Sequence, residues 1–242
     1  MKFAKPFLYG FFIVAIAVMG FVIWASSALG PEPEALAALR SDDHVSVSLD
    51  EYVVFQPASR QVSTAFVFYP GGRVDYRSYA APLRRIAADG YLVILLPVRL
   101  NLAFFDINAA AGPIASFPEI RHWVVGGHSL GGVAAAEYAG RNHDLDGVVF
   151  WASYPANDAL RNTGLKILSI YGTLDMGGMD AFEASRLKLP STTKFVVIDG
   201  GNHGQFGDYG FQPGDNEATI SRAEQQKQVV EATVKFLKEI SE

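Results

Sequence analysis

Short runs of consecutive apolar residues recur through most of the chain, and the longer segments between them carry apolar residues at helical spacing. Runs of this kind are typical of strands buried on both faces, and their alternation with helices produces a mostly parallel sheet with helices on either side. The pattern therefore predicts an α/β domain. The expected strands are residues 52–55, 62–69, 91–96, 123–126, 147–152, 166–171 and 194–198, and the last expected helix is 223–240.

A different pattern precedes this domain. Residues 7–29 carry no charge and follow Lys2 and Lys5. At a rise of about 1.5 Å per residue they span a bilayer, and they exceed the roughly 7–15 apolar residues of a secretory signal peptide, which is the alternative interpretation. We therefore predict a transmembrane anchor with its N-terminus inside and the domain outside the cytoplasm, because lysines favour the inner side. The expected divisions are 1–6, a short cytoplasmic segment; 7–29, the anchor; 30–43, a tether; and 44–242, one domain.

Composition narrows the possible partners. About 210 residues follow the anchor, which is enough for one domain with a sizeable core. The formal net charge of −5 argues against a nucleic-acid partner. The chain has no cysteine, so disulfides and thiolate metal sites are excluded, and we find no metal-ligand spacing and no phosphate-binding glycine loop.

The segment 127–131 reads Gly-His-Ser-Leu-Gly and lies between an expected strand and a helix-forming stretch. A turn this sharp holds the serine in strained backbone geometry, and glycines on both sides avoid collisions with the neighbouring elements. The hydroxyl of Ser129 is thereby raised above the edge of the sheet. The segment predicts a nucleophile elbow.

An acid and a base follow the serine in the order that this chemistry requires. Asp175 comes after the expected strand 166–171, and His203 comes after 194–198. A serine hydroxyl is a weak nucleophile near neutral pH, so His203 would remove its proton while Asp175 orients and stabilises the imidazole. Asp199 is the alternative acid. His128, beside the nucleophile, is expected to pack rather than to act as the base.

Backbone donors must stabilise the negative charge that develops on the substrate's carbonyl oxygen. The N–H of Leu130 is the first expected donor. The second is expected in the Pro-Gly-Gly-Arg segment 70–73 after a buried strand, where Gly72 is preferred. The N–H of Arg73 is the alternative if the register shifts by one residue.

Four motifs together resemble the α/β-hydrolase superfamily, and the resemblance extends over nearly everything after Asp43. They are Tyr-Pro-Gly-Gly at 69–72, Gly-His-Ser-Leu-Gly-Gly at 127–132, Tyr-Gly-Thr-Leu-Asp at 171–175 and Gly-Asn-His at 201–203. Within the superfamily the chain is most similar to the small, lidless bacterial dienelactone hydrolases and short-chain carboxylesterases. The resemblance implies the α/β-hydrolase fold and a cofactor-free Ser-His-Asp mechanism, with an acyl-enzyme intermediate, acting on a small-molecule ester.

Two departures limit what the resemblance implies. Tyr69-Pro70 stands where many esterases carry His-Gly, and the cysteine nucleophile of the dienelactone hydrolases proper is missing, so opening of a dienelactone ring is not implied. A catalytically silent binding protein on the same fold is one alternative, and another acyl-transfer or peptidase activity of the superfamily is a second.

Four further residues are candidate substrate contacts. About a dozen residues, 154–164, separate the expected strands 147–152 and 166–171, which leaves no room for a lid and favours small or extended esters. Trp151 and Tyr154 would form one pocket wall, with core packing as the alternative for Trp151. Arg73 and Arg99 both follow strand ends, and they would bind an anionic substrate group if they converge.

Overall fold

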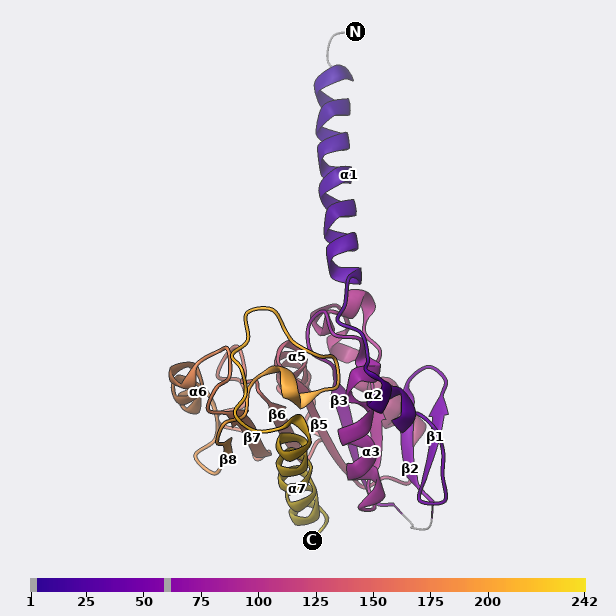
Figure 1. Cartoon of the computed structure of the whole chain (residues 1–242), viewed down its shortest axis with the longest axis vertical. Helices are drawn as coiled ribbons and strands as arrows, with labels where there is room; N and C mark the ends of the chain where they lie inside the picture. Colours follow the sequence, from indigo (N-terminus) through magenta and orange to yellow (C-terminus); the bar gives the residue numbers. More distant parts are fainter. Residues whose placement is uncertain (1–3, 59–61) are drawn as a thin grey trace.

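The computed structural model describes residues 4–58 and 62–242 and contains one eight-stranded sheet with helices on both faces (Figure 1). The strand order is β1-β2-β4-β3-β5-β6-β7-β8. Strand β2 runs antiparallel to β1 and β4, and the other neighbours are parallel. The strands are β1 Val45–Leu49, β2 Val53–Pro57, β3 Thr64–Tyr69, β4 Leu92–Leu95, β5 His122–His128, β6 Gly147–Trp151, β7 Lys166–Gly172 and β8 Lys194–Ile198.

Side chains of successive strand residues enter two separate cores, one on each face of the sheet. In β3, Phe66 and Phe68 pack with helices α3 and α7, whereas Ala65 and Val67 pack with α5. Both cores are buried, which explains the uninterrupted apolar runs. The α-helices are α1 Ala4–Ser26, α2 Pro33–Ala38, α3 Ala80–Ala88, α4 Ala111–Ser116, α5 Leu130–Ala139, α6 Met179–Ser185 and α7 Arg222–Ser241, and the 3-10 helices are η1 Tyr76–Tyr79, η2 Arg99–Asn101, η3 Ala103–Ala110, η4 Arg186–Lys188 and η5 Gly204–Phe206.

The expected fold class is confirmed, with shifts of a few residues at the element boundaries. Strand β1 was not predicted, because its serines alternate with apolar residues and only Val45 is buried. It is an edge strand that pairs with β2 alone. The connection 152–165 between β6 and β7 contains neither helix nor strand, in agreement with the lidless expectation.

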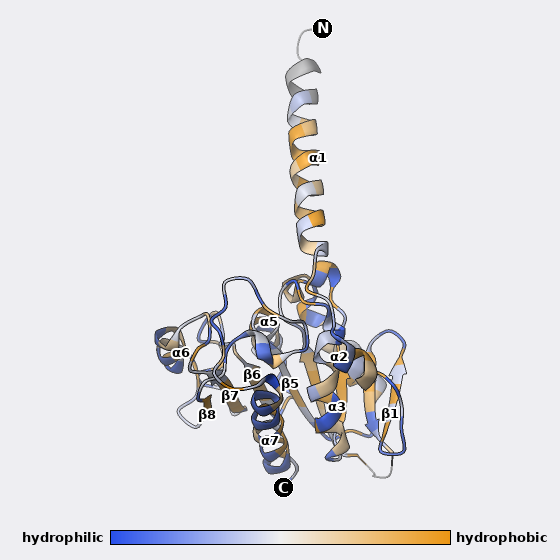
Figure 2. Cartoon of the chain, viewed as in Figure 1, coloured by the Kyte–Doolittle hydropathy of each residue, from blue (hydrophilic) through white to orange (hydrophobic). Residues whose placement is uncertain are grey.

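Helix α1 stands clear of the sheet, and apolar residues predominate along it (Figures 1 and 2). Its window Tyr9–Ser26 is long and apolar enough to cross a membrane, and nearly all of that window is exposed. Of the expected cytoplasmic segment 1–6, residues 1–3 lie outside the described part of the chain.

The expected tether 30–43 is packed against the domain. It contains helix α2, which contacts α3 and buries Ala35 completely. The backbone N–H of Glu32 donates to the carbonyl of Asp208 (2.8 Å), and the Glu32 carboxylate pairs with Arg222. The segment is therefore held by apolar burial and polar contacts, which its Pro- and Glu-rich composition did not reveal.

Candidate active site

Ser129 occupies a strained turn between β5 and α5. Its φ of 52° and ψ of −123° lie in a region that residues with a side chain rarely adopt. The close approach of the chain requires glycine on both sides: a Cβ on Gly127 would lie 2.5 Å from the carbonyl carbon of Gly131, and a Cβ on Gly131 would lie 2.3 Å from the carbonyl oxygen of Tyr69. The turn is the geometry expected of a nucleophile elbow.

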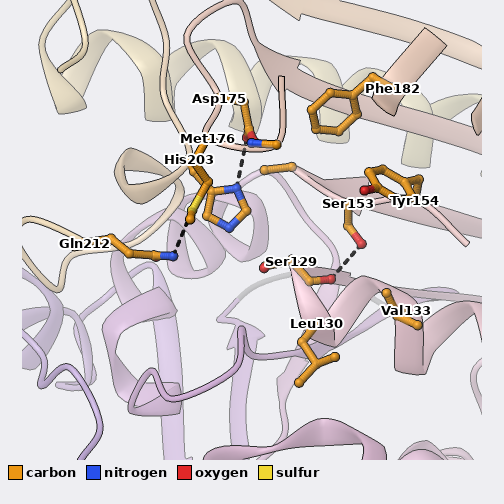
Figure 3. Close-up of a pocket in the computed structure, with 12 residues that line it drawn as sticks. Ser129, Leu130, Val133, Ser153, Tyr154, Asp175, Met176, Phe182, His203 and Gln212 are labelled. Carbon is orange, nitrogen blue, oxygen red and sulfur yellow. Dashed lines mark hydrogen bonds and ion pairs between the residues drawn. The ribbon is translucent and has the colours of Figure 1, made fainter. Parts of the chain in front are cut away.

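Asp175 and His203 form a buried pair above this turn. Nδ1 of His203 lies 2.9 Å from Oδ2 of Asp175, and the two side chains are 8% and 2% exposed. Because a carboxylate accepts, Nδ1 carries the proton and Nε2 is the free nitrogen. The N–H of Gly177 donates to the other carboxylate oxygen (2.8 Å), which fixes the acid. Figure 3 shows the second ring nitrogen on the side that faces Ser129.

The three side chains line one pocket of about 360 Å³. Within the described residues, the Ser129 hydroxyl makes no hydrogen bond to the His203 ring. Catalytic hydrogen bonds of this kind often tighten only when substrate binds. The alternative acid, Asp199, is exposed and accepts from the hydroxyl of Thr173 (3.3 Å). The structure thus brings Asp175 to His203 and leaves Asp199 elsewhere.

Two residues that the sequence did not single out hold the loop that carries the histidine. The carboxylate of Asp215 accepts from the backbone N–H groups of His203 (3.3 Å) and Gly204 (2.7 Å). The side-chain amide of Gln225, on α7, bonds both the N–H and the carbonyl of Asn202 (3.0 and 2.8 Å). Both lie more than ten residues along the chain from the groups they bind, so no local sequence signal links them.

The two expected second oxyanion donors differ in their hydrogen bonding. The N–H of Arg73 already donates to the carbonyl of Asn101 (2.8 Å). Within the described residues the N–H of Gly72 has no such partner, and this glycine lies against Leu130, since a Cβ on it would meet Leu130 Cδ2 at 3.0 Å. Leu130 is the first residue of α5, where a helix leaves its N–H groups without internal partners.

His128 connects three loops of the site. It is fully buried, and its Nε2 lies 3.1 Å from the carbonyl of His203, so Nε2 must be the donor. Its Nδ1 then accepts from the Tyr79 hydroxyl (2.8 Å), which in turn accepts from the N–H of Gly71 (3.1 Å). This neutral, fully partnered ring ties the elbow to the glycine loop and to the histidine loop, as a packing residue and not as a base.

Protonation of His128 is expected to destabilise the fold. Burial, together with the nearby His203, lowers the pKa of His128 well below its ordinary value of 6.5. Below pH 6.5 the His128 ring is protonated in the unfolded chain but remains neutral in the folded chain. The free energy of unfolding therefore falls as the pH drops from 6.5 toward the folded-state pKa, by at most about 1.4 kcal/mol per pH unit. We expect the melting temperature to fall more steeply between pH 6.5 and 5 in wild type than in His128→Asn. His44→Asn, at an exposed histidine, is the control, and equal slopes for wild type and His128→Asn would contradict the expectation.

The remaining pocket wall is apolar and aromatic. Tyr154 lines it, as expected, and its ring meets Phe182 edge-on at 5.5 Å. Phe182 comes from α6, and sequence reasoning missed it because a lone aromatic in a short helix reads as core. Figure 3 shows both rings on one side of the pocket. The other apolar residues that line the pocket are Leu130, Val133, Ala152 and Met176.

Three expected substrate contacts lie elsewhere. Trp151 is fully buried, with its ring 4.6 Å from Phe68 and its Nε1 bonded to Thr233 (3.2 Å). Trp151 therefore packs in the core, which was the alternative expected for it. Arg73 reaches back to α1, and Arg99 pairs with Asp106, so the two arginines do not converge on the pocket. We assign none of the three to substrate binding.

Among the residues that the structure describes, no group of three or more His, Asp or Glu side chains is placed to hold a metal ion. Ser129, the oriented imidazole of His203 and Leu130 line one pocket, and Gly72 lies against Leu130.

Comparison with known proteins identifies the family and the fold. A sequence model of the alpha/beta hydrolase family matches residues 65–227. Among solved structures, the fold is similar to a dienelactone hydrolase from Anabaena variabilis (15% identity, 79% of this chain and 98% of that one, TM-score 0.60) and to a thermostable esterase from Pseudomonas putida (15%, 84% and 86%, 0.57). It is also similar to the esterase domain of a Rhodothermus marinus protein (14%, 76% and 90%, 0.58). A search of curated protein sequences gave no match.

Proposed function

The chain belongs to the alpha/beta hydrolase family, and from that premise we propose that it is a serine hydrolase that cleaves carboxylic esters through an acyl-enzyme intermediate. The observation that carries the proposal is the buried Asp175–His203 pair, which lines the same pocket as the strained Ser129. The esterases among the structural relatives make ester hydrolysis the favoured reaction.

In the proposed mechanism each group has a defined role. Nε2 of His203 takes the proton from the Ser129 hydroxyl as the oxygen attacks the ester carbonyl, and it later gives that proton to the leaving alcohol. Asp175 keeps the ring in the Nδ1–H tautomer and stabilises the imidazolium. The N–H groups of Leu130 and Gly72 would hold the oxyanion. A water molecule, activated by the same imidazole, then attacks the acyl-enzyme and releases the acid.

We further propose that α1 anchors the enzyme as a single-pass membrane protein, with the hydrolase domain outside the cytoplasm. The length and composition of the window Tyr9–Ser26 support a membrane span, and the orientation rests on the lysines that precede it. Mass spectrometry of the protein isolated from membranes would test retention of the helix. A mature N-terminus beyond Ser26 would show that the segment is a cleaved signal peptide.

The size of the pocket predicts a preference for short acyl chains. A volume of about 360 Å³ with no lid above it leaves a long acyl chain largely in water. With p-nitrophenyl esters in a fixed detergent, we expect kcat/KM to be highest for acetate or butyrate and to fall by about tenfold or more toward palmitate. A preference for palmitate would contradict this reading of the pocket.

Labelling by a fluorophosphonate probe separates the hydrolase from a catalytically silent protein on the same fold. The proposal expects the folded wild-type chain to react covalently at Ser129, with the adduct located by peptide mass spectrometry. A folded protein that does not label would favour the silent binding protein.

A further inference from the structure

The end of α1 is bound directly to the loop that follows β3. The Arg73 guanidinium donates to the carbonyls of Trp24 and Ser27 (both 3.0 Å) at the C-terminal end of α1, and it lies 4.6 Å from the Trp24 ring centre. Leu29 then forms a parallel bridge with Val74. Helix α1 therefore joins the domain without a flexible linker, so the position of the membrane span fixes the position of the domain.

A contact between α1 and η3 indicates where η3 lies relative to the bilayer. The ring of Phe105, in η3, lies 6.2 Å from the ring of Phe21. The window Tyr9–Ser26 is about 27 Å long, close to the roughly 30 Å thickness of the hydrocarbon core, so it fills that core. Phe21 lies five residues before Ser26, about 7.5 Å inside the boundary. Its neighbour Phe105 then lies in the outer part of the bilayer, near this boundary.

Two exposed aromatic residues of η3 suit a position near the boundary of the bilayer. Phe104 and Phe105 are 46% and 39% exposed, and their rings lie 4.3 Å apart. The adjacent Asp106 is paired with Arg99, whose Nε lies 2.6 Å from Oδ1, so its charge is compensated. An exposed apolar patch often marks a site of interaction, and Phe, with Trp and Leu, forms the buried face of helices that lie in a membrane interface.

The active site lies at the same edge of the sheet. Gly72, the proposed oxyanion donor, is the residue before Arg73 and lies against Leu130 of the pocket. The loop between η5 and α7 also extends toward α1 (Figure 1). In that loop Gln212 lines the pocket, and the next residue toward the N-terminus, Phe211, is 65% exposed.

We propose that Phe104 and Phe105 lie in the lipid–water interface, that the pocket opens toward this surface, and that the substrate is an amphiphile bearing a short acyl ester. The inference rests on the proposed function and on α1 as a membrane span. The short acyl group enters the pocket, whose volume of about 360 Å³ suits it, while the rest of the amphiphile remains in the membrane. Hydrolysis then releases a short acid to water and leaves the alcohol in the lipid.

Spin labelling tests the docking without reference to activity. The chain contains no cysteine, so the substitutions Phe104→Cys, Phe211→Cys and Leu187→Cys each create a single labelling site in the full chain. Leu187, in η4 beside α6, is 71% exposed and is the control. In phosphatidylcholine nanodiscs, labels at 104 and 211 should collide more often with oxygen, which concentrates in lipid, than with a water-soluble nickel chelate. The label at 187 should show the reverse.

The other outcomes overturn the inference. A label at 104 that collides mainly with the nickel chelate would place η3 in water. A label at 104 that is shielded from both reagents would indicate contact with a second protein copy. A label at 104 in lipid with one at 211 in water would turn the pocket away from the membrane.

Paired substrates test the substrate class. Hydrolysis of 1-hexadecyl-2-acetylglycerol within the nanodiscs is compared with hydrolysis of triacetin, a water-soluble glycerol acetate. We expect the ratio of the two kcat/KM values to favour the lipid ester and to fall by about tenfold in the double variant Phe104→Ser/Phe105→Ser. Leu187→Ser should leave the ratio unchanged. If neither ester is cleaved and no probe labels Ser129, the proposed function fails. If triacetin is cleaved and the double variant leaves the ratio unchanged, the inference alone fails.

Discussion

Replacing Ser129 by alanine is expected to lower kcat toward p-nitrophenyl acetate by about 10⁴-fold or more, because the substitution removes the atom that forms the acyl-enzyme. KM should change little, since the pocket walls remain. The Ser129 hydroxyl makes no hydrogen bond to the imidazole within the described structure, so the melting temperature should also be nearly unchanged. Steady-state kinetics and a thermal melt on the same preparation test all three expectations.

A second serine in the pocket supplies the matched control. The Ser153 hydroxyl donates to the backbone carbonyl of Ser129 (2.6 Å), so it supports the elbow without offering a nucleophile in the proposed mechanism. Ser153→Ala loses one hydrogen bond, worth about 0.5–1.5 kcal/mol, and should slow turnover by roughly tenfold at most while fluorophosphonate labelling persists. Substantial turnover in Ser129→Ala, with none in Ser153→Ala, would mean that the nucleophile is misassigned.

The sequence was sufficient for the groups whose positions depend on strand ends. Parallel strands bring their carboxyl ends to one edge, so residues that follow β5, β7 and β8 gather there however far apart they are in the chain. Ser129, Asp175 and His203 are such residues, and the structure brings all three to one pocket. The strained φ of Ser129 also follows from local sequence, because its flanking glycines are the residues that permit it.

Side chains that act across the fold could not be predicted in the same way. Arg73 and Arg99 follow strand ends too, yet each is engaged by a nearer partner, Arg73 by the carbonyls of α1 and Arg99 by Asp106. The bonds of His128 to Tyr79 and to the His203 carbonyl join residues 49 and 75 positions apart. Which of many polar groups become neighbours depends on loop conformation, and spacing in the sequence carries no record of it.

The substitution Asp175→Asn should reduce kcat about 10⁴-fold by changing the tautomer of the base. The N–H of Gly177 donates to Oδ1 of Asp175, so an asparagine keeps its oxygen there and turns its NH₂ toward His203. Nδ1 must then accept, the proton moves to Nε2, and no free nitrogen faces Ser129. Near neutral pH the rate of fluorophosphonate labelling should fall in parallel with kcat, because both reactions need the same base.

The matched control for this substitution is Asp199→Asn, which makes the same chemical change at the rival acid. Asp199 is exposed, and among the described side chains its carboxylate accepts a hydrogen bond only from the Thr173 hydroxyl, a bond that an asparagine oxygen can also accept. Its kcat should stay within about twofold of wild type, in keeping with the small effect of a surface substitution. The reverse outcome, a rate lost in Asp199→Asn and kept in Asp175→Asn, would require the imidazole to change partners when substrate binds, and the pair at 2.9 Å would then be an inactive arrangement of the site.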